Sequence, residues 1–194
     1  MNLEIENQYI GQIVAGIDEA GRGPLAGPVV AAAVIINQNN IIDGINDSKK
    51  LNATKREYLY NEITSSYIWA VGIISPDEID KINILQATIK ACIIAEQGLV
   101  TKANIVLVDG NMKFNDARFV SIVKGDAKSI SIAAASIVAK VTRDKIMHTL
   151  SLRHPNYGWH KNSGYGTKEH IAAMIKYGVC EHHRKSFKIK NIDY

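Results

Sequence analysis

Four acidic side chains stand beside apolar runs of the sequence: Asp18, Glu19, Asp109 and Asp126. The first pair and Asp109 each come directly after a short apolar run typical of a buried strand, and Asp126 precedes a long alanine-rich segment. Hard divalent cations such as Mg²⁺ and Mn²⁺ prefer oxygen ligands, and two such ions can activate water and stabilise the leaving oxygen of a phosphodiester. Any one of these acids alone could be solvated or cap a helix, but four together favour a metal site for phosphoryl chemistry.

A short glycine-rich segment, made of Gly21, Arg22 and Gly23, follows the first acidic pair. The two glycines leave backbone N–H groups approachable, and the guanidinium of Arg22 can contact a phosphate or a sugar edge. The spacing matches neither a Walker loop nor a dinucleotide-binding fingerprint. We therefore expect a substrate-contacting turn at this position, and the alternative is a plain turn.

Apolar runs and helical periodicity predict the elements that must position these residues. Strands are expected at 14–17, 29–36, 67–74, 104–108 and 119–123. Helices are expected at 54–65, after a capping box at Ser75, at 129–150 and at 168–177. In the second helix, one face is expected to be buried because apolar residues recur at steps of three and four, at Leu85, Ile89, Cys92, Ala95 and Leu99.

Composition limits the class of protein. The chain has 194 residues, 46% of them hydrophobic, which predicts one globular domain over 1–194. Its net charge of +4 divides into −3 over 1–139 and +7 over 140–194, so a basic C-terminal region with a tail around Arg184, Lys185, Lys188 and Lys190 could follow a polyanion. Two cysteines and no basic, apolar leader predict a cytoplasmic protein, and the apolar run 24–36 is too short for a membrane helix.

Other candidate residues have simpler interpretations. Cys180, His182 and His183 have side chains that can bind zinc, but their spacing lacks a fourth partner, so a basic terminal segment is favoured. Lys49 and Lys50 could touch phosphate or could be solvated. Lys140 and Asp144, four residues apart on a predicted helix, are expected to form a surface ion pair.

Segments spread along the chain resemble the ribonuclease HII family, beginning with GIDEAGRGPLAGP at 16–28. The others follow in the family's order: NDSKKL at 46–51, Asp109-Gly110, KGD at 124–126, AAASIVAKVTRD at 133–144, GYGT at 164–167 and HHRKSF at 182–187. The resemblance covers about 14–187. Ordered matches over this length are far more specific than one short motif.

This resemblance implies a ribonuclease H-like α/β fold, with a mixed central sheet flanked by helices and a helical C-terminal extension from about residue 150. It implies that the family's metal-binding carboxylates are Asp18, Glu19, Asp109 and Asp126. It further implies that Gly21, Arg22 and Gly23 grip the junction between a ribonucleotide and the following DNA and sense the 2′-hydroxyl, while the ring of Tyr165 stacks on the next deoxyribose.

The activity implied is hydrolysis of the RNA strand of RNA-DNA hybrids and incision 5′ of single ribonucleotides in duplex DNA, with Mn²⁺ or Mg²⁺, leaving 3′-hydroxyl and 5′-phosphate ends. A monomer with no obligatory protein partner and no membrane association is expected. Two alternatives remain at this stage. One is a nuclease or integrase of the same superfold that cuts DNA regardless of sugar, and the other is a non-catalytic nucleic-acid-binding module.

Overall fold

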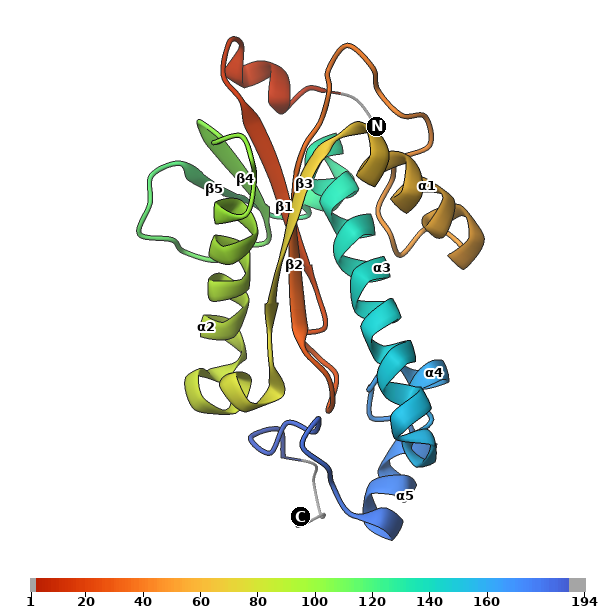
Figure 1. Ribbon diagram of the computed structural model, residues 1–194. Coiled ribbons are helices and arrows are strands. Elements are labelled where there is room, and N and C mark those ends of the chain that lie inside the picture. The colour runs from red at the N-terminus through yellow and green to blue at the C-terminus, as the bar shows by residue number, and fades with distance from the viewer. Residues whose placement is uncertain (1–2, 189–194) are drawn as a thin grey trace.

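A five-stranded mixed sheet forms the centre of the computed structural model, which describes residues 3–188 (Figure 1). Its strand order is β3-β2-β1-β4-β5. The strands are β1 (Val14–Ala20), β2 (Val29–Ile35), β3 (Ile68–Ile74), β4 (Ile105–Asp109) and β5 (Phe119–Ile122). β2 pairs antiparallel with β1 and β3, whereas β4 pairs parallel with β1 and β5. Because β1 and β4 are parallel neighbours, their carboxyl ends meet at one edge of the sheet.

Helices cover both faces of this sheet, with α2 on one side and α1 and α3 on the other (Figure 1). The α-helices are α1 (Ala53–Ser66), α2 (Pro76–Gln97), α3 (Ile130–Arg153), α4 (Trp159–Asn162) and α5 (Lys168–Tyr177). The 3-10 turns are η1 (Glu6–Tyr9), η2 (Gly125–Ala127) and η3 (Pro155–Tyr157). The expected mixed α/β fold with a helical C-terminal extension is confirmed. No helix among residues 3–188 is both long and apolar enough to cross a membrane.

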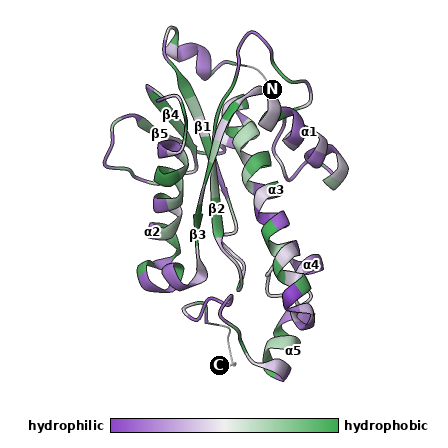
Figure 2. Cartoon of the chain, in the orientation of Figure 1, coloured by the Kyte–Doolittle hydropathy of each residue, from purple (hydrophilic) through white to green (hydrophobic). Residues whose placement is uncertain are grey.

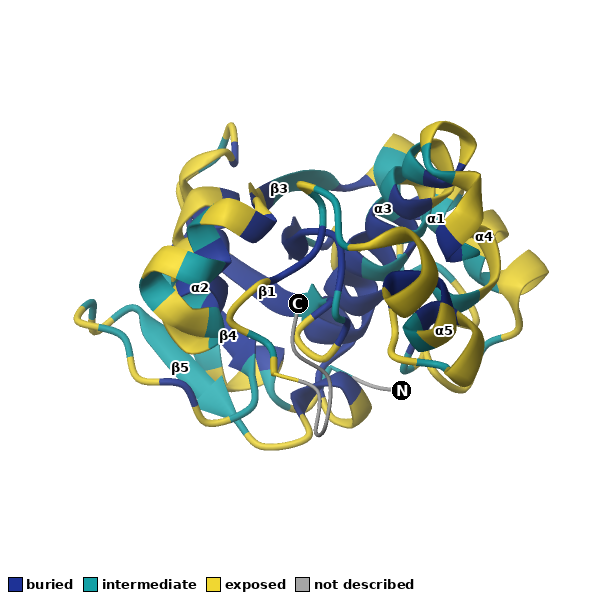
Figure 3. Ribbon diagram, turned by 90° about the horizontal axis from the view of Figure 1, so that it is seen from below, coloured by how far each residue is buried: buried dark blue, intermediate teal, exposed yellow. Residues whose placement is uncertain are grey.

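The strands of the sheet are hydrophobic (green in Figure 2) and lie in the buried centre of the molecule (dark blue in Figure 3). Their alternating side chains pack on the two faces of the sheet. Ala31 and Ala33 of β2 pack on the α2 side, whereas Ala32 and Val34 pack on the side of α1 and α3. Helix α3 lies very close to β1. A Cβ atom added to Gly16 would be only 2.1 Å from the Ser131 carbonyl carbon, so only glycine fits at this position. This close approach brings the turn that precedes α3 next to the acidic end of β1.

The first strand is longer than the sequence predicted. Asp18 pairs with Ala32 and Glu19 with Ala31 in the β1-β2 ladder, so both acids lie inside β1 rather than after it. The prediction that the strand ends at Ile17 was wrong because the partner strand β2 continues to pair through Ala20. Backbone hydrogen bonds of a ladder hold a strand extended even through polar residues.

Helix α2 is interrupted, which the periodicity did not reveal. Asn83 has φ of 64°, and its Oδ1 accepts hydrogen bonds from the N–H groups of Leu85 and Gln86, so it caps a new helical segment. Leu85, in the first turn of that segment, is 43% exposed, so its predicted burial was wrong. Cys92 is buried in the core, as predicted.

The N-terminal turn η1 contributes a buried acid to the start of α3. Glu6 Oε1 accepts hydrogen bonds from the backbone N–H of Ser131 and from the hydroxyls of Ser129 and Ser131. A carboxylate is stabilised at a helix N-terminus by free N–H groups and by the helix dipole. Glu6 therefore fixes the first turn of α3, directly after the segment that carries Asp126.

Candidate active site

Three of the four predicted acids converge on one point. Carboxylate oxygens of Asp18 from β1, Asp109 from the end of β4 and Asp126 from η2 all lie within 4.8 Å of one another. Glu19 stands next to Asp18 on β1, with Oε1 3.6 Å from Arg22 Nη1 and with Oε2 buried and without a hydrogen-bond partner. Three acids from three separate elements thus meet at one edge of the sheet, and Glu19 is adjacent to one of them in the sequence.

These acids are held in an environment that disfavours their charge. Burial, followed by repulsion from Glu19 and Asp109, raises the pKa of Asp18 well above its usual value. Burial and then the charge of Asp109 raise the pKa of Asp126. Burial also raises the pKa of Glu19, against the opposing attraction of Arg22. An environment of this kind favours cation binding, because a positive ion removes the repulsion that the acids exert on one another.

Backbone donors orient the carboxylates. Asp109 Oδ1 accepts a hydrogen bond of 2.7 Å from the Gly125 N–H and a longer one of 3.4 Å from the Asp126 N–H. Asp18 Oδ1 accepts a hydrogen bond of 2.7 Å from the Glu19 N–H. In both Asp18 and Asp109 the oxygen that accepts these hydrogen bonds is Oδ1. Oxygen donors at this spacing, with the unpartnered Oε2 of Glu19, fit a hard divalent cation.

Lys49 faces the acidic cluster across a short loop. Its Nζ lies 3.6 Å from Asp126 Oδ2 although the side chain is 80% exposed, which places the ammonium at the mouth of the site. The loop is tied to α3 by a hydrogen bond from the Ser48 N–H to Ser136 Oγ, and to α1 by Arg56, whose Nε donates to the Ser48 carbonyl. Both lysines weighed from the sequence are exposed, and Lys49 is placed with its ammonium beside an acid of the cluster.

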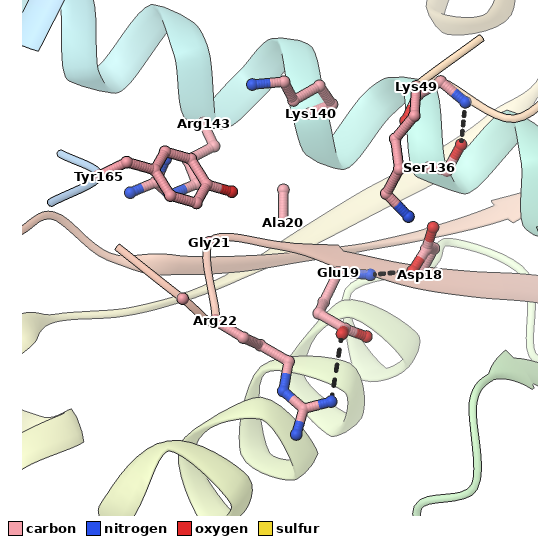
Figure 4. A pocket seen from close by; sticks show the side chains of 12 residues that line it. Asp18, Glu19, Ala20, Gly21, Arg22, Lys49, Ser136, Lys140, Arg143 and Tyr165 are labelled. Carbon is pink, nitrogen blue, oxygen red and sulfur yellow. Dashed lines mark hydrogen bonds and ion pairs between the residues drawn. The ribbon is translucent and has the colours of Figure 1, made fainter. Parts of the chain in front are cut away.

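One cleft of about 250 Å³ connects the acids to the other predicted residues (Figure 4). Its lining includes Asp18, Glu19, Gly21, Arg22, Gly23 and Tyr165, together with Lys49, Ser136, Lys140 and Arg143. The Tyr165 ring is 47% exposed, and its Cε1 lies 3.7 Å from the position a Cβ would take on Gly23. The structure thus brings the predicted substrate-contacting residues together beside the acids.

The two glycines of the cleft differ in what they tolerate. Gly21 has φ of +98°, and a Cβ there would lie 2.1 Å from Arg143 Nε, whereas a Cβ on Gly23 would make only ordinary contact with Tyr165. We expect Gly21→Ala to lower stability by more than about 2 kcal/mol, because it adds both strain and a clash. Gly23→Ala should change stability by less than about 0.5 kcal/mol but reduce cleavage, because its methyl group enters the cleft. Urea unfolding together with a cleavage assay on both variants checks this contrast, which equal losses of stability would contradict.

Arg143 supports the loop between β1 and β2, which begins with Gly21, Arg22 and Gly23 and is called the glycine-rich loop below. Its Nε donates to the Pro28 carbonyl, Nη2 to the Ala26 carbonyl and Nη1 to the Ser163 carbonyl, each at 3.0 Å. The side chain is buried, and these three hydrogen bonds all go to backbone carbonyls. The sequence did not indicate that this arginine would hold the loop.

Arg184 makes a similar set of contacts from the C-terminal segment. Its Nε and Nη2 donate to the Gly27 carbonyl, Nη1 donates to the Arg22 carbonyl, and Nη2 also donates to the Gly21 carbonyl. Burial and then the nearby charge of Arg143 lower the pKa of Arg184 to about 9, so the group still carries its charge at neutral pH. The prediction that this residue belongs to a basic tail was wrong, because it is 1% exposed and holds the cleft loop. Lys188 is exposed, and Lys190 lies outside the described residues.

A chain of neutral histidines links the C-terminal segment to the backbone of Tyr165. His183 Nδ1 accepts from the Cys180 N–H, and its Nε2 lies 3.2 Å from His170 Nε2. His170 Nε2 also accepts from Trp159 Nε1, so the proton between the two imidazoles belongs to His183, and His170 Nδ1–H donates to the Tyr165 carbonyl. Burial, and then the proximity of His170, lower the pKa of His183 to about 4, and burial also lowers that of His170.

This arrangement predicts sensitivity to acid. A histidine whose folded pKa lies below its unfolded value of about 6.5 contributes full stability above that value, and the contribution is lost as the pH falls towards 4. We expect wild-type protein to lose up to about 3 kcal/mol more than His183→Gln between pH 7 and pH 4. Unfolding free energies measured across this range provide the comparison. Parallel pH profiles for the two proteins would contradict the assignment.

The remaining sequence predictions near the site have clear outcomes. Lys140 Nζ lies 2.7 Å from Asp144 Oδ1, so the expected ion pair is present, while Lys140 also lines the cleft. Sequence reasoning missed the supporting roles of Arg143, His170 and Arg184. For Arg143 and His170, the available signal was a charged or ring-nitrogen side chain within a segment of mostly apolar residues, whereas the polar segment around Arg184 offered no such signal.

The chain is similar to known proteins over almost its full length. The family model described as Ribonuclease HII matches residues 15–190. A ribonuclease HII of Rickettsia bellii (strain OSU 85-389) is 67% identical over 185 residues, which cover 95% of this chain and 94% of the relative. One from Rickettsia akari (strain Hartford) is 67% identical over 186 residues, covering 96% of each chain.

Solved structures have the same arrangement of elements. The ribonuclease H2 of Pyrococcus horikoshii OT3 superimposes with a TM-score of 0.74 at 30% identity, covering 90% of this chain and 93% of that one. A chain from the PCNA:RNase HII complex of Archaeoglobus fulgidus superimposes with a TM-score of 0.75 at 27% identity, covering 93% of this chain and 98% of that one.

Proposed function

The chain belongs to the ribonuclease HII family, whose members are divalent-metal-dependent endonucleases acting on RNA-DNA hybrids, and we propose that this protein also incises duplex DNA on the 5′ side of a single embedded ribonucleotide. The observation that carries the proposal is the cleft in which Asp18 and Glu19 of the acidic cluster line the wall together with Gly21, Arg22, Gly23 and Tyr165. A metal site alone suffices for phosphodiester hydrolysis, whereas selection of one ribonucleotide requires a group that reads its sugar next to that site.

We propose that Asp18, Glu19, Asp109 and Asp126 hold Mn²⁺ or Mg²⁺. The convergence of three carboxylates within 4.8 Å and the buried, unpartnered Oε2 of Glu19 support this assignment. The chemistry supplied by bound divalent cations at such a site is activation of water for attack on phosphorus and neutralisation of charge on the departing 3′-oxygen. Cleavage of this P–O3′ bond leaves the 3′-hydroxyl and 5′-phosphate ends that we propose.

The residues of the chain then orient the scissile phosphate. Lys49 at the mouth of the site and Lys140 along the cleft are placed to pair with phosphate oxygens of the substrate. Hydrogen bonds from Gly125 and Asp126 N–H groups hold Asp109 in one rotamer, so its oxygen does not have to reorganise when substrate binds. We propose that the protein acts as a monomer without an obligatory protein partner.

The sugar is read by the glycine-rich loop and Tyr165. The 2′-hydroxyl is the group that distinguishes RNA from DNA at a given nucleotide, and backbone groups of Gly21 and Gly23 can approach it without steric hindrance from a side chain. The half-exposed Tyr165 ring beside Gly23 offers a flat surface on which the following deoxyribose can pack. We propose that the two features together select the junction between a ribonucleotide and DNA.

Comparison of two duplexes tests this function. A duplex with one ribonucleotide should be cut, and the same duplex made entirely of DNA should not, under identical Mg²⁺ or Mn²⁺ concentrations. Equal cleavage of both would instead favour a nuclease that ignores the sugar. Cleavage of neither, with tight binding of both, would favour a binding module.

Loss of the Tyr165 ring should weaken junction recognition. We expect Tyr165→Ala to reduce cleavage at an isolated ribonucleotide by about tenfold or more, and to reduce cleavage within continuous RNA by less, because continuous RNA offers many registers. Tyr165→Phe retains the ring and serves as one control, and Tyr177→Ala, which removes a similarly exposed tyrosine from α5, serves as the other. Equal losses on the two substrates would remove the junction role.

A further inference from the structure

A second group of metal-binding side chains lies outside the acidic cleft. His154 is the C-terminal cap of α3, and it lies near Cys180 and Glu181, which belong to the segment after α5. One ligand atom of each of these three residues lies within 4.8 Å of the others. His182 lies next to this group of three, with its Nε2 3.7 Å from Glu181 Oε1, and is the candidate for a fourth donor. The corresponding separation for His154 Nε2 is 3.9 Å.

The donor types differ from those of the catalytic cluster. A thiolate, two imidazoles and one carboxylate form a borderline-soft set, which suits Zn²⁺ and related transition metals and is unsuited to Mg²⁺. When a metal binds, the Cys180 thiol would release its proton to solvent, and the thiolate and the Glu181 carboxylate would together balance a divalent ion. Four donors also match the tetrahedral coordination that structural zinc sites adopt.

His183 does not belong to this group, although the sequence placed it beside Cys180 and His182. Its Nδ1 accepts from the Cys180 N–H and lies 3.4 Å from Cys180 Sγ, and its Nε2 faces His170, so both ring nitrogens are already engaged; coordination of a metal by Cys180 would replace the contact between Sγ and His183. The partner that the sequence spacing lacked is provided by His154, which lies 26 residues before Cys180 and reaches it only through the fold.

We propose that His154, Cys180, Glu181 and His182 bind a transition-metal ion of the Zn²⁺ type, independently of the catalytic cations. None of the four residues lines the catalytic cleft. The His154 ring packs near Trp159, with centroids 5.6 Å apart, and near His182, at 5.1 Å, so two donors are already held by aromatic neighbours. Cys180 and both histidines are partly exposed, which leaves a path for an ion to enter.

Metal at this position would strengthen the support of the cleft loop. The Gly27 N–H donates to the His182 carbonyl, and the Arg184 N–H donates to the Leu25 carbonyl, so the segment that carries three of the donors is paired with the loop. An ion shared with His154 ties this segment to the end of α3. Because the ion binds the folded state, it should raise the unfolding temperature.

Absorption spectroscopy with Co²⁺, a spectroscopic substitute for Zn²⁺, tests the proposal on the full-length protein in excess Mg²⁺, which occupies the carboxylate site. We expect wild-type protein to develop a thiolate-to-cobalt charge-transfer band that saturates at one equivalent and is abolished by Zn²⁺. Cys180→Ser should lack the band, and the matched control Cys92→Ala should retain it, because Cys92 is buried in the core. Absence of the band in wild-type protein, or its persistence in Cys180→Ser, would overturn the proposal.

Two further measurements use neither catalysis nor the Cys180→Ser variant. In the Cys92→Ala protein, Zn²⁺ should slow modification of Cys180 by a thiol reagent, and an unchanged rate would contradict thiolate coordination. His154→Gln should weaken Zn²⁺ binding by more than about tenfold in competition with a chelating dye. An unchanged affinity would contradict the assigned ligand set.

Discussion

Asp109→Asn will reduce cleavage of an RNA-DNA hybrid by at least about 1,000-fold, while leaving the fold intact. The substitution replaces one charged oxygen of the acidic cluster with an amide, and several kcal/mol of transition-state stabilisation depend on cation binding at that cluster. The asparagine Oδ1 can still accept the hydrogen bonds from Gly125 and Asp126, so η2 keeps its support. Steady-state cleavage rates and hybrid affinity, measured on the same protein, test the expectation.

The unfolding temperature of Asp109→Asn provides an independent test of the same assignment. Asp109 contributes to the raised pKa of Asp18 and Asp126 through charge repulsion, so its neutralisation should raise the unfolding temperature when divalent cations are chelated. Asp116→Asn, which removes an acid paired with Arg118 outside the cluster, should leave cleavage unchanged. Retention of more than about one tenth of wild-type activity by Asp109→Asn, in either Mg²⁺ or Mn²⁺, would exclude Asp109 as a ligand.

The second large effect is expected from Arg184→Met. The substitution removes the donors that satisfy the carbonyls of Gly21, Arg22 and Gly27, and each buried carbonyl left without a partner costs about 1–3 kcal/mol. We expect a loss of about 3 kcal/mol or more in unfolding free energy. At a temperature where the variant remains folded, kcat/KM should fall by about 10- to 100-fold, because the loop beside the acids is displaced.

The adjacent exposed lysine provides the control for this experiment. Lys185→Met removes the same charge from the C-terminal segment and leaves the buried hydrogen bonds in place, so it should affect stability by less than about 0.5 kcal/mol. If Lys185→Met and Arg184→Met weakened cleavage equally, the effect would come from the loss of positive charge in the C-terminal segment. That outcome would contradict the positioning role of Arg184.

Much of the fold could be predicted from local patterns. Apolar runs indicated five strands, and the helix 168–177 was predicted with the bounds observed, because apolar periodicity and punctuating residues are local signals. The acids were selected for the same reason, since a carboxylate next to a buried strand contrasts with its neighbours. Their convergence is explained by the structure, in which β1 and β4 are parallel neighbours.

The supporting contacts depend on tertiary structure and left weaker signals. Arg184 lies more than 150 residues from the loop it holds, and an arginine near a chain end resembles a solvated charge in the sequence. The break in α2 at Asn83 depends on a single side chain that caps the helical segment after it. A periodic pattern over the whole helix does not reveal the effect of one residue. The meeting of His154 with Cys180 required the path of α4 and α5, which no spacing rule supplies.

Cleavage of a duplex with one embedded ribonucleotide, resolved to the nucleotide, tests the central claim most directly. With Mg²⁺ or Mn²⁺ we expect one nick, on the 5′ side of the ribonucleotide, leaving a 3′-hydroxyl on the upstream DNA and a 5′-phosphate on the ribonucleotide. Chelation of the metal should abolish the nick. A nick on the 3′ side, or cuts at deoxyribonucleotides with equal frequency, would contradict the account of a metal site coupled to a sugar-reading cleft.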